Sequence, residues 1–371
     1  MNTELEEKTE RITAMLQRES LAAVLLNTQH NFAWLTAGCF NGIDTSRENG
    51  AATLLITCEG RRFVLANNIE MRRMLAEVVQ ASEFDPIEYP WQSEKVSGGF
   101  LIEKAREVVG KKDLGIDVAL SPDARVIERP VSGCRYRLTE SEVQRFRALG
   151  RDAGTAVRKV IDTVRPGETE IEIAEKLRHE LAVGEMSSAV TLVAADDRIN
   201  QFRHPVPTTN RWHKTLLIVT CAKRHGLIVS LSRMICVGDV SDDLKTQTEA
   251  AAYVNAKILD ATTDGETGAE IYRTAKLAYA ESGFADEIDL HHQGGATGYR
   301  TRDWVAHPAS DDIVAVNQAF AWNPSITGTK VEETCIVTEG GIEMITTSPD
   351  FPFIMNVVNG REYLSPGILT I

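Results

Sequence analysis

The sequence predicts an α/β protein of two unequal domains, the second of which is built from a duplicated unit. Its 371 residues exceed the length at which a single hydrophobic core stops growing. Helical and strand patterns alternate through the first third of the chain, as they do in small α/β domains. Farther along, the turn Gly167-Glu168-Thr169 recurs as Gly265-Glu266-Thr267. We therefore expect a small α/β domain over residues 1–137 and a larger domain over residues 138–371.

The N-terminal domain is expected to start with an amphipathic helix and then to alternate strands with helices. Two apolar runs on either side of Glu59-Gly60-Arg61 indicate a β-hairpin, because a short charged turn separates them. The predicted helices cover residues 3–18, 69–79 and 99–109, and the predicted strands cover residues 22–26, 52–57, 62–66, 84–89 and 114–117.

The second domain is expected to begin at Thr139, which forms a capping box with Glu142 at the start of a long helix. Thr169 and Glu172 repeat this signal at the start of a second helix. Each half of the domain then continues into strands, at 216–219 and 227–231 in the first half and at 319–323 and 331–337 in the second. Two copies of one ααβ unit predict a pseudo-twofold domain with a site where the two sheets meet.

The composition restricts the class of partner. With 53 acidic against 40 basic residues, the net charge of -13 argues against nucleic acid or an anionic membrane surface as a partner. No apolar run reaches the length of a membrane span, and the charged N-terminus does not resemble a signal peptide. The six cysteines are scattered without a CxxC pair, so we expect reduced thiols. These features predict a cytoplasmic protein.

Residues 290–304 predict a functional site. This stretch combines two histidines, His291 and His292, with Gly294, Gly295, Gly298, two arginines and an acid. Glycine lets the backbone approach a ligand closely, and the polar side chains offer donors and acceptors. The alternative is a glycine-rich surface turn with solvated side chains. We favour a site, because loops on a rigid scaffold carry function disproportionately.

Several segments together resemble a known superfamily. The histidine-glycine stretch is followed by the step Asn323-Pro324, by the run Val331-Glu332-Glu333-Thr334 and by a Val-Thr-Glu-Gly-Gly turn. Their order and spacing resemble the "pita-bread" superfamily of aminopeptidase P, prolidase, methionine aminopeptidase and creatinase. The resemblance implies a creatinase-like α/β domain over residues 1–137 and a pita-bread catalytic domain over residues 138–371.

The metal ligands of the peptidases in this superfamily are largely absent. Those enzymes hold two metal ions with two aspartates, one histidine and two glutamates, a set suited to hard or borderline divalent ions. In this sequence Val219 and Ser230 stand at or near the aspartate positions, and Asn323 replaces one glutamate. One of the paired histidines and Glu332 remain. We therefore expect no catalytic metal and no cofactor, with an adventitious ion on His291 and His292 as the open alternative.

The resemblance to creatinase suggests how such a site could work without metal. Residues 203–211 resemble the creatinase segment that carries its catalytic histidine, which makes His204 the candidate general acid/base. Histidine suits this task because its pKa lies near neutral pH. His292 and Glu332 are expected to complete the proton network, and Asn323 is expected to donate to the developing oxyanion. The metallopeptidases also have a histidine at this position, so His204 alone does not identify the chemistry.

Arginines in the resembling segments predict an anionic substrate, because guanidinium groups bind carboxylates in a bidentate manner. Arg302 resembles a substrate-binding arginine of creatinase; the alternative role for its side chain is a structural ion pair with Asp303. Arg47 resembles an arginine that a partner subunit contributes, which implies a homodimer; its alternative is an ordinary loop charge. The predicted substrate-binding residues are Arg47, Arg203, His291, Tyr299, Arg300 and Arg302. Creatine itself is an unsuitable substrate, because Ser230 and Asn323 replace the glutamates that hold its guanidinium group.

The sequence thus predicts a homodimeric, metal-independent hydrolase that cleaves an amide or amidine C–N bond in a small substrate with a carboxylate. Two classes of rival remain open on the same fold. One is a metal-dependent Xaa-Pro aminopeptidase or dipeptidase acting on a dipeptide substrate. The other is a lyase or a ligand-binding protein without catalytic activity, because fold resemblance does not determine function.

Overall fold

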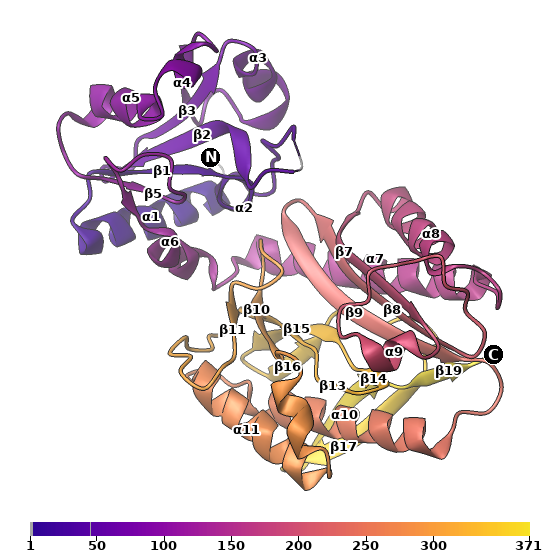
Figure 1. Ribbon diagram of the computed structural model, residues 1–371. Helices are drawn as coiled ribbons and strands as arrows, with labels where there is room; N and C mark the ends of the chain where they lie inside the picture. The colour runs from indigo at the N-terminus through magenta and orange to yellow at the C-terminus, as the bar shows by residue number, and fades with distance from the viewer. Residues whose placement is uncertain (1–2, 45) are drawn as a thin grey trace. The chain divides into compact units, whose positions relative to one another are not determined.

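The computed structural model describes residues 3–44 and 46–371. Thr45, which lies in the segment between the predicted strands 22–26 and 52–57, and the first two residues lie outside this described part. The chain divides into two compact units, Met1–Arg135 and Tyr136–Ile371 (Figure 1). Within the described residues, no helix is long and apolar enough to cross a membrane.

The N-terminal unit is a mixed six-stranded sheet with the strand order β4-β3-β2-β1-β5-β6. The predicted hairpin is present: β2 and β3 pair antiparallel, with Leu54 opposite Val64. Strand β4 pairs parallel with β3, and β5 pairs parallel with β1. The strands are β1 (Ala23–Thr28), β2 (Asn49–Thr57), β3 (Arg62–Asn67), β4 (Asp85–Tyr89), β5 (Leu114–Ile116) and β6 (Arg125–Val126).

Helices cover this sheet. The three predicted helices are present, whereas α2, α4 and α6 were not predicted. One core combines Leu25 and Phe63 of the sheet with Ile102 of α5. The predicted helix at 69–79 begins as one α-helical turn, α3, and continues as the π-helical turn η1. The helices are α1 (Thr3–Glu19), α2 (Gln29–Leu35), α3 (Met71–Arg73), η1 (Met74–Val78), α4 (Ser93–Val96), α5 (Phe100–Val109) and α6 (Glu128–Arg135).

The C-terminal unit contains the predicted duplication. The first half has α7 (Glu140–Thr163), α8 (Glu170–Val183), β7 (Ser187–Ala195), the short α9 (Arg198–Gln201), β8 (Thr215–Arg224) and β9 (Leu227–Cys236). Both predicted capping boxes are formed, with Thr139 accepting from Glu142 N and Thr169 accepting from Glu172 N. Strands β7, β8 and β9 form an antiparallel meander.

The second half repeats this plan with shorter strands. Its elements are α10 (Asp242–Ala261), α11 (Gly268–Glu281), the 3₁₀ turn η2 (Ala285–Asp289), β10 (Gly294–Thr297), β11 (Trp304–Val305), β12 (Ala319–Trp322), β13 (Ser325–Ile326), β14 (Thr329–Lys330), β15 (Glu333–Thr338) and β16 (Gly341–Met344). Strands β10, β12 and β15 form the second antiparallel meander. The hairpin β17 (Phe353–Val358) and β18 (Arg361–Pro366) follows, and β19 (Ile368–Thr370) then joins the first sheet beside β9.

Matching backbone hydrogen bonds relate the two halves. In the first half, Gly167 N donates to Trp212 O and Trp212 N donates to Glu168 O. In the second half, Gly265 N donates to Val314 O and Val314 N donates to Glu266 O. The recurring Gly-Glu-Thr turns are thus held by the same pair of backbone hydrogen bonds in both halves, as expected for two copies of one unit.

The two sheets meet along β9 and the segment 330–334. Ser232 N donates to Glu332 O over 3.0 Å, and Ser230 N donates to Thr334 Oγ1 over 2.8 Å. Ser230 and Glu332, which the sequence analysis singled out, lie at this junction.

Candidate active site

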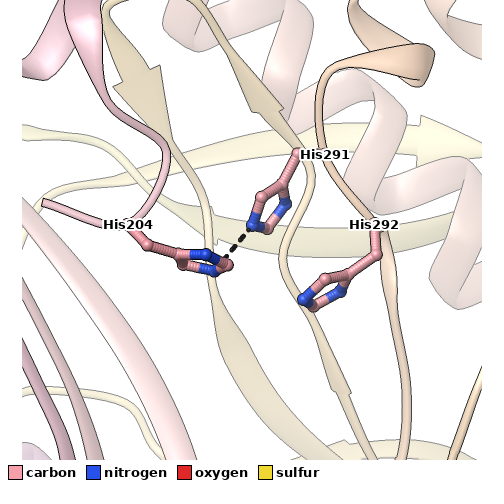
Figure 2. Close-up of side chains that lie close together, drawn as sticks. All are labelled: His204, His291 and His292. Carbon is pink, nitrogen blue, oxygen red and sulfur yellow. Dashed lines mark hydrogen bonds between the residues drawn. The ribbon is translucent and has the colours of Figure 1, made fainter.

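Three histidines from both halves converge in the C-terminal unit. His204 follows α9 in the first half, whereas His291 and His292 precede β10 in the second half. His204 Nε2 lies 3.1 Å from His291 Nε2, and the rings of His291 and His292 stack with centroids 4.4 Å apart. Figure 2 shows the three rings gathered around one point. The structure therefore brings together the three histidines that the sequence suggested for catalysis and binding.

Arg203 fixes the position of His204. Its guanidinium group forms an ion pair with Glu287 of η2 and donates to Ser325 Oγ over 3.1 Å and to Thr327 Oγ1 over 3.0 Å. These bonds connect the loop before His204 to the second half of the unit. Arg203 was predicted to bind substrate, but its side chain is already engaged by protein partners. These contacts place it as a support for the loop that carries His204.

Gln293 and Tyr279 support the other two histidines. The side chain of Gln293 is buried, donates to His291 O over 2.5 Å and accepts from the Tyr279 hydroxyl over 2.7 Å. The Tyr279 hydroxyl, on α11, also donates to Ser325 O over 3.1 Å. The histidine pair is thus anchored to the same segment, near Ser325, that holds Arg203.

The glycines after the histidines have a different role from the predicted one. They were expected to let the backbone approach a ligand, but Gly294 and Gly295 lie in the buried strand β10. A Cβ atom would lie 2.2 Å from Ala321 O at Gly294 and 2.1 Å from Trp304 O at Gly295. Glycine is required here because neighbouring strands of the protein itself approach closely. The prediction of a ligand-facing glycine loop was wrong.

Glu332 lies between two cationic side chains. Arg302 Nη2 is 3.1 Å from Glu332 Oε1, and Lys330 Nζ is 3.5 Å from Glu332 Oε2. All three side chains are largely buried, Arg302 being 12% exposed. Arg302 therefore pairs with Glu332 and not with Asp303, the alternative that the sequence left open. Arg302 Nη1 also donates to Ser230 Oγ over 3.3 Å.

The three histidines are neutral near pH 7. Burial lowers the pKa of His291 to about 2 and that of His292 to about 4, although part of His292 is exposed. Burial also lowers the pKa of His204. The positive charge of Lys330 lowers the pKa of all three histidines further. A neutral imidazole has a free lone pair, so each ring can accept a proton or bind a metal ion.

Several buried polar atoms of the site have no hydrogen-bond partner within the described part of the chain. They are His291 Nδ1, Arg302 Nε, Asn323 Oδ1 and Glu332 Oε2. Asn323, predicted to donate to an oxyanion, is 2% exposed, and its backbone N–H donates to Gln293 O over 3.0 Å. Unpartnered buried polar groups are uncommon in folded proteins, and their concentration here is typical of a ligand site.

The other three predicted substrate-binding residues differ in exposure. Tyr299 is 2% exposed and donates to Glu142 Oε1 over 2.8 Å, so it belongs to the core and is not accessible to a ligand. Arg300 is an exposed residue of the following turn. In the N-terminal unit, Arg47 is exposed, lies 3.8 Å from Asp44 and lines a hollow of about 280 Å³.

Sequence analysis missed Lys330, Tyr279 and Glu287. Lys330 lies in a two-residue strand, and Tyr279 has the spacing of an ordinary core residue of α11. Only their long-range contacts reveal their part in the site. The sequence offered one indication that Lys330 belongs to the site, because it stands two residues before Glu332, which had been selected.

A model of the metallopeptidase family M24 matches residues 144–339, more than half of the chain. The chain belongs to this family. A relative among characterised proteins, the Xaa-Pro dipeptidase of Lactobacillus delbrueckii subsp. lactis, is 22% identical over 226 residues. That alignment covers 58% of this chain and 61% of the relative, so the chain matches only about three fifths of the relative's length.

Solved structures confirm the predicted pita-bread fold with its N-terminal α/β domain. The Xaa-Pro dipeptidase from Bacillus anthracis superimposes with a TM-score of 0.80 at 20% identity, covering 99% of this chain and 100% of that one. The N-terminal domain of the FACT complex subunit SPT16 from Cicer arietinum also superimposes, with a TM-score of 0.71 at 11% identity, over 92% and 96% of the two chains. These likenesses establish the fold.

The family implies a metal centre, and the residues present do not fit one with two metal ions. Val219, Ser230 and Asn323, which the sequence resemblance puts at or near carboxylate positions of the family, are all buried. Ser230 contacts Cys221 Sγ and Arg302 instead. Glu332, the carboxylate that remains, is paired with Arg302 and Lys330. Two cationic side chains next to one carboxylate oppose the binding of two divalent cations there.

Proposed function

We propose that this protein is a hydrolase that cleaves a C–N bond in a small substrate carrying a carboxylate, with a dipeptide or an N-acyl amino acid as the first class to test. One observation carries the proposal: a cluster of neutral histidines adjoins a buried Arg302–Glu332–Lys330 cluster in a member of the metallopeptidase family M24. The names of its relatives, Xaa-Pro dipeptidases, support cleavage of a peptide-like bond.

His204 is the general acid/base of the proposed reaction. It is the exposed member of the His204–His291 pair, and its neutral ring can remove a proton from water. The same proton can then be returned to the leaving nitrogen. His292 and Glu332 complete the proton network, and Asn323 donates to the oxyanion that develops on the carbonyl. Arg302 and Lys330 supply the positive charge that favours an anionic substrate.

The proposed reaction does not use the two-metal centre of the family. Its support is the donor set: buried valine, serine and asparagine side chains at the carboxylate positions, and a remaining glutamate that is already neutralised. Water activation is therefore assigned to histidine.

A metal-dependent Xaa-Pro dipeptidase is the second candidate function. The family and the names of the relatives favour it directly. It predicts that a chelator abolishes activity and that added divalent metal restores it. The metal-independent hydrolase predicts that activity survives the chelator.

The test is a substrate screen with dialysed protein. Xaa-Pro dipeptides, N-acyl amino acids and N-carbamoyl amino acids are incubated in ¹⁸O-labelled water, with EDTA and separately with Mn²⁺ or Co²⁺. Despite EDTA, we expect one ¹⁸O atom in the carboxylic acid released from a dipeptide or an N-acyl amino acid, or release of carbon dioxide and ammonia from an N-carbamoyl amino acid. For His204→Gln we expect a loss of about 10²- to 10⁴-fold in kcat. Turnover only with added metal would favour the dipeptidase, and products without ¹⁸O would indicate a lyase. Absence of turnover with every class would contradict both hydrolases.

We also propose a homodimer in which Arg47 completes the site of the other chain. The support is the resemblance of its segment to creatinase and the exposure of its side chain. Mixing inactive Arg47→Ala chains with inactive His204→Ala chains should then restore activity, because a mixed dimer contains one intact site. Subunit exchange is verified with labelled chains. Exchange without restored activity would remove Arg47 from the site.

A further inference from the structure

The three histidines have a second chemical capability besides proton transfer. One ring nitrogen from each of His204, His291 and His292 lies within 4.8 Å of the other two. We propose that these three imidazoles bind a single borderline transition-metal ion, such as Zn²⁺ or Ni²⁺. This site differs from a carboxylate-rich two-metal centre in both its ligands and the number of ions it holds.

The separations of the ring nitrogens suit such an ion. Zinc–nitrogen bonds of about 2.0–2.1 Å in a tetrahedral site place the ligand atoms about 3.3 Å apart. His204 Nε2 and His291 Nε2 are already 3.1 Å apart, and the ring of His292 is stacked on that of His291. The ligand atoms of the three rings lie within 4.8 Å of one another, so the exposed rings of His204 and His292 must rotate to close around an ion. Figure 2 shows the three rings as the structure has them.

The protein presents these ligands on anchored loops. Arg203, next to His204, is bound to Glu287 and Ser325. Gln293, next to His292, is bound to Tyr279, which in turn donates to Ser325 O. Because both loops are fixed to one segment, little conformational entropy remains to be lost when the three rings bind an ion.

Charge and ligand type together determine which ions can bind. Three neutral nitrogens favour zinc, nickel, copper and cobalt over magnesium and calcium, which require oxygen ligands. Lys330 and Arg302 weaken the binding of any cation, whereas Glu332 offsets one of these two charges. We therefore expect reversible binding of one ion, weaker than that of a structural zinc site.

Metal binding has a defined consequence for the proposed reaction, and this part rests on the proposed function. An ion at the cluster occupies the lone pair of His204 that would otherwise accept a proton from water. Zinc should therefore inhibit the enzyme, and a chelator should relieve that inhibition. This member of the family would then be inhibited by the metal ion, whereas a metal-dependent peptidase requires its metal for activity.

Isothermal titration calorimetry of the full chain without a histidine tag tests the binding. We expect about one equivalent of ZnCl₂ to bind and MgCl₂ to give no binding heat. His291→Ala and, separately, the more exposed His292→Ala should each weaken zinc binding at least tenfold. His179→Ala removes an exposed histidine of α8 and should leave the binding unchanged, because His179 is not a member of the cluster.

The calorimetry tests the proposed metal site, and the activity assay tests the proposed function, so each proposal can be contradicted without the other. Zinc binding that is absent, or that is equal in wild type and in both cluster variants, overturns the proposed metal site even if substrate is hydrolysed. Zinc binding without hydrolysis of any substrate leaves the metal site supported and counts against the proposed function. If zinc binds and increases turnover, the metal site is supported but the predicted inhibition is wrong. That result would favour the metal-dependent dipeptidase.

Discussion

Each unit of the molecule buries a cluster of charged side chains, and the two clusters differ in how completely they are hydrogen-bonded. In the N-terminal unit, Asp117 accepts from Asn27 N, Thr28 N, Thr28 Oγ1 and Asn31 Nδ2 over 2.6–3.0 Å. Nearby, Glu128 pairs with the fully buried Arg135 over 2.9 Å. In the C-terminal unit, Glu332 Oε2, Arg302 Nε and His291 Nδ1 have no hydrogen-bond partner among the described residues.

This difference distinguishes a cluster that stabilises a fold from one that can bind a ligand. Desolvation of a charged group costs free energy that hydrogen bonds must offset. At Glu128 the bonding partners prevail and lower the carboxyl pKa, whereas at Asp117 burial outweighs the hydrogen bonds and raises it. The atoms around Glu332 remain incompletely satisfied, which is favourable only if a ligand or water completes them. Buried charge alone therefore does not identify an active site. Here the incompletely hydrogen-bonded atoms of Arg302 and Glu332 accompany an unpartnered nitrogen of the histidine cluster.

The largest expected effect is on stability. Arg135→Met leaves Glu128 without its guanidinium partner, so the free energy of unfolding of the N-terminal unit should fall by about 3–5 kcal/mol. Hydrogen exchange of β1 and β2, followed by mass spectrometry, measures this change locally. The matched variant Arg302→Met leaves Glu332 paired with Lys330 and should cost the C-terminal unit on the order of 1–2 kcal/mol. Equal losses would contradict the distinction between the clusters.

The second prediction concerns the stability of the N-terminal unit at low pH. Burial favours protonation of Glu128, but the hydrogen bond from His30 and the charge of Arg135 prevail and lower its pKa from 4.5 to about 2. A depressed carboxyl pKa contributes stability that is fully present above about pH 4.5 and is lost as the pH falls toward 2. Between pH 5 and pH 2, the free energy of unfolding of the N-terminal unit should fall by about 2–3 kcal/mol more in wild type than in Glu128→Gln. Urea unfolding at several pH values measures the difference, and parallel pH profiles would refute it.

The smallest expected effect is on substrate affinity. Arg302→Lys keeps the positive charge but loses the planar guanidinium group, so apparent affinity should fall by about 1–3 kcal/mol. The measurement is the Michaelis constant for the substrate that the screen identifies. Arg273→Lys, at an exposed position on α11 that was never assigned to the site, serves as the control. An unchanged Michaelis constant together with reduced stability would make Arg302 a structural residue, like Arg135.

Local signals made the fold predictable from the sequence. The capping boxes at Thr139 and Thr169 and the hairpin turn at Glu59-Gly60-Arg61 depend on residues three or four positions apart. The duplication was visible because a short turn motif recurs and is clamped identically in both halves. Such patterns depend on local geometry and do not require knowledge of distant contacts.

The site was only partly predictable, because its pairings are long-range. The sequence selected His204, His291, Arg302 and Glu332, and the structure places them around the junction of the two halves. It did not reveal that Arg203 pairs with Glu287, or that neighbouring strands require glycine in β10. Tyr299 stands in the same motif as the histidines, yet its side chain lies in the core. Composition of a motif does not determine the direction of each side chain.

The three histidines come from separate halves of the unit, and this affects how the proposed activity could be lost. His204 belongs to the first half and His291 to the second, and the link between Arg203 and Glu287 holds the halves in register at that place. The distance between the two rings therefore reports how the halves are docked. A small slippage of one half over the other would silence the site while each half kept its own helices and sheet intact.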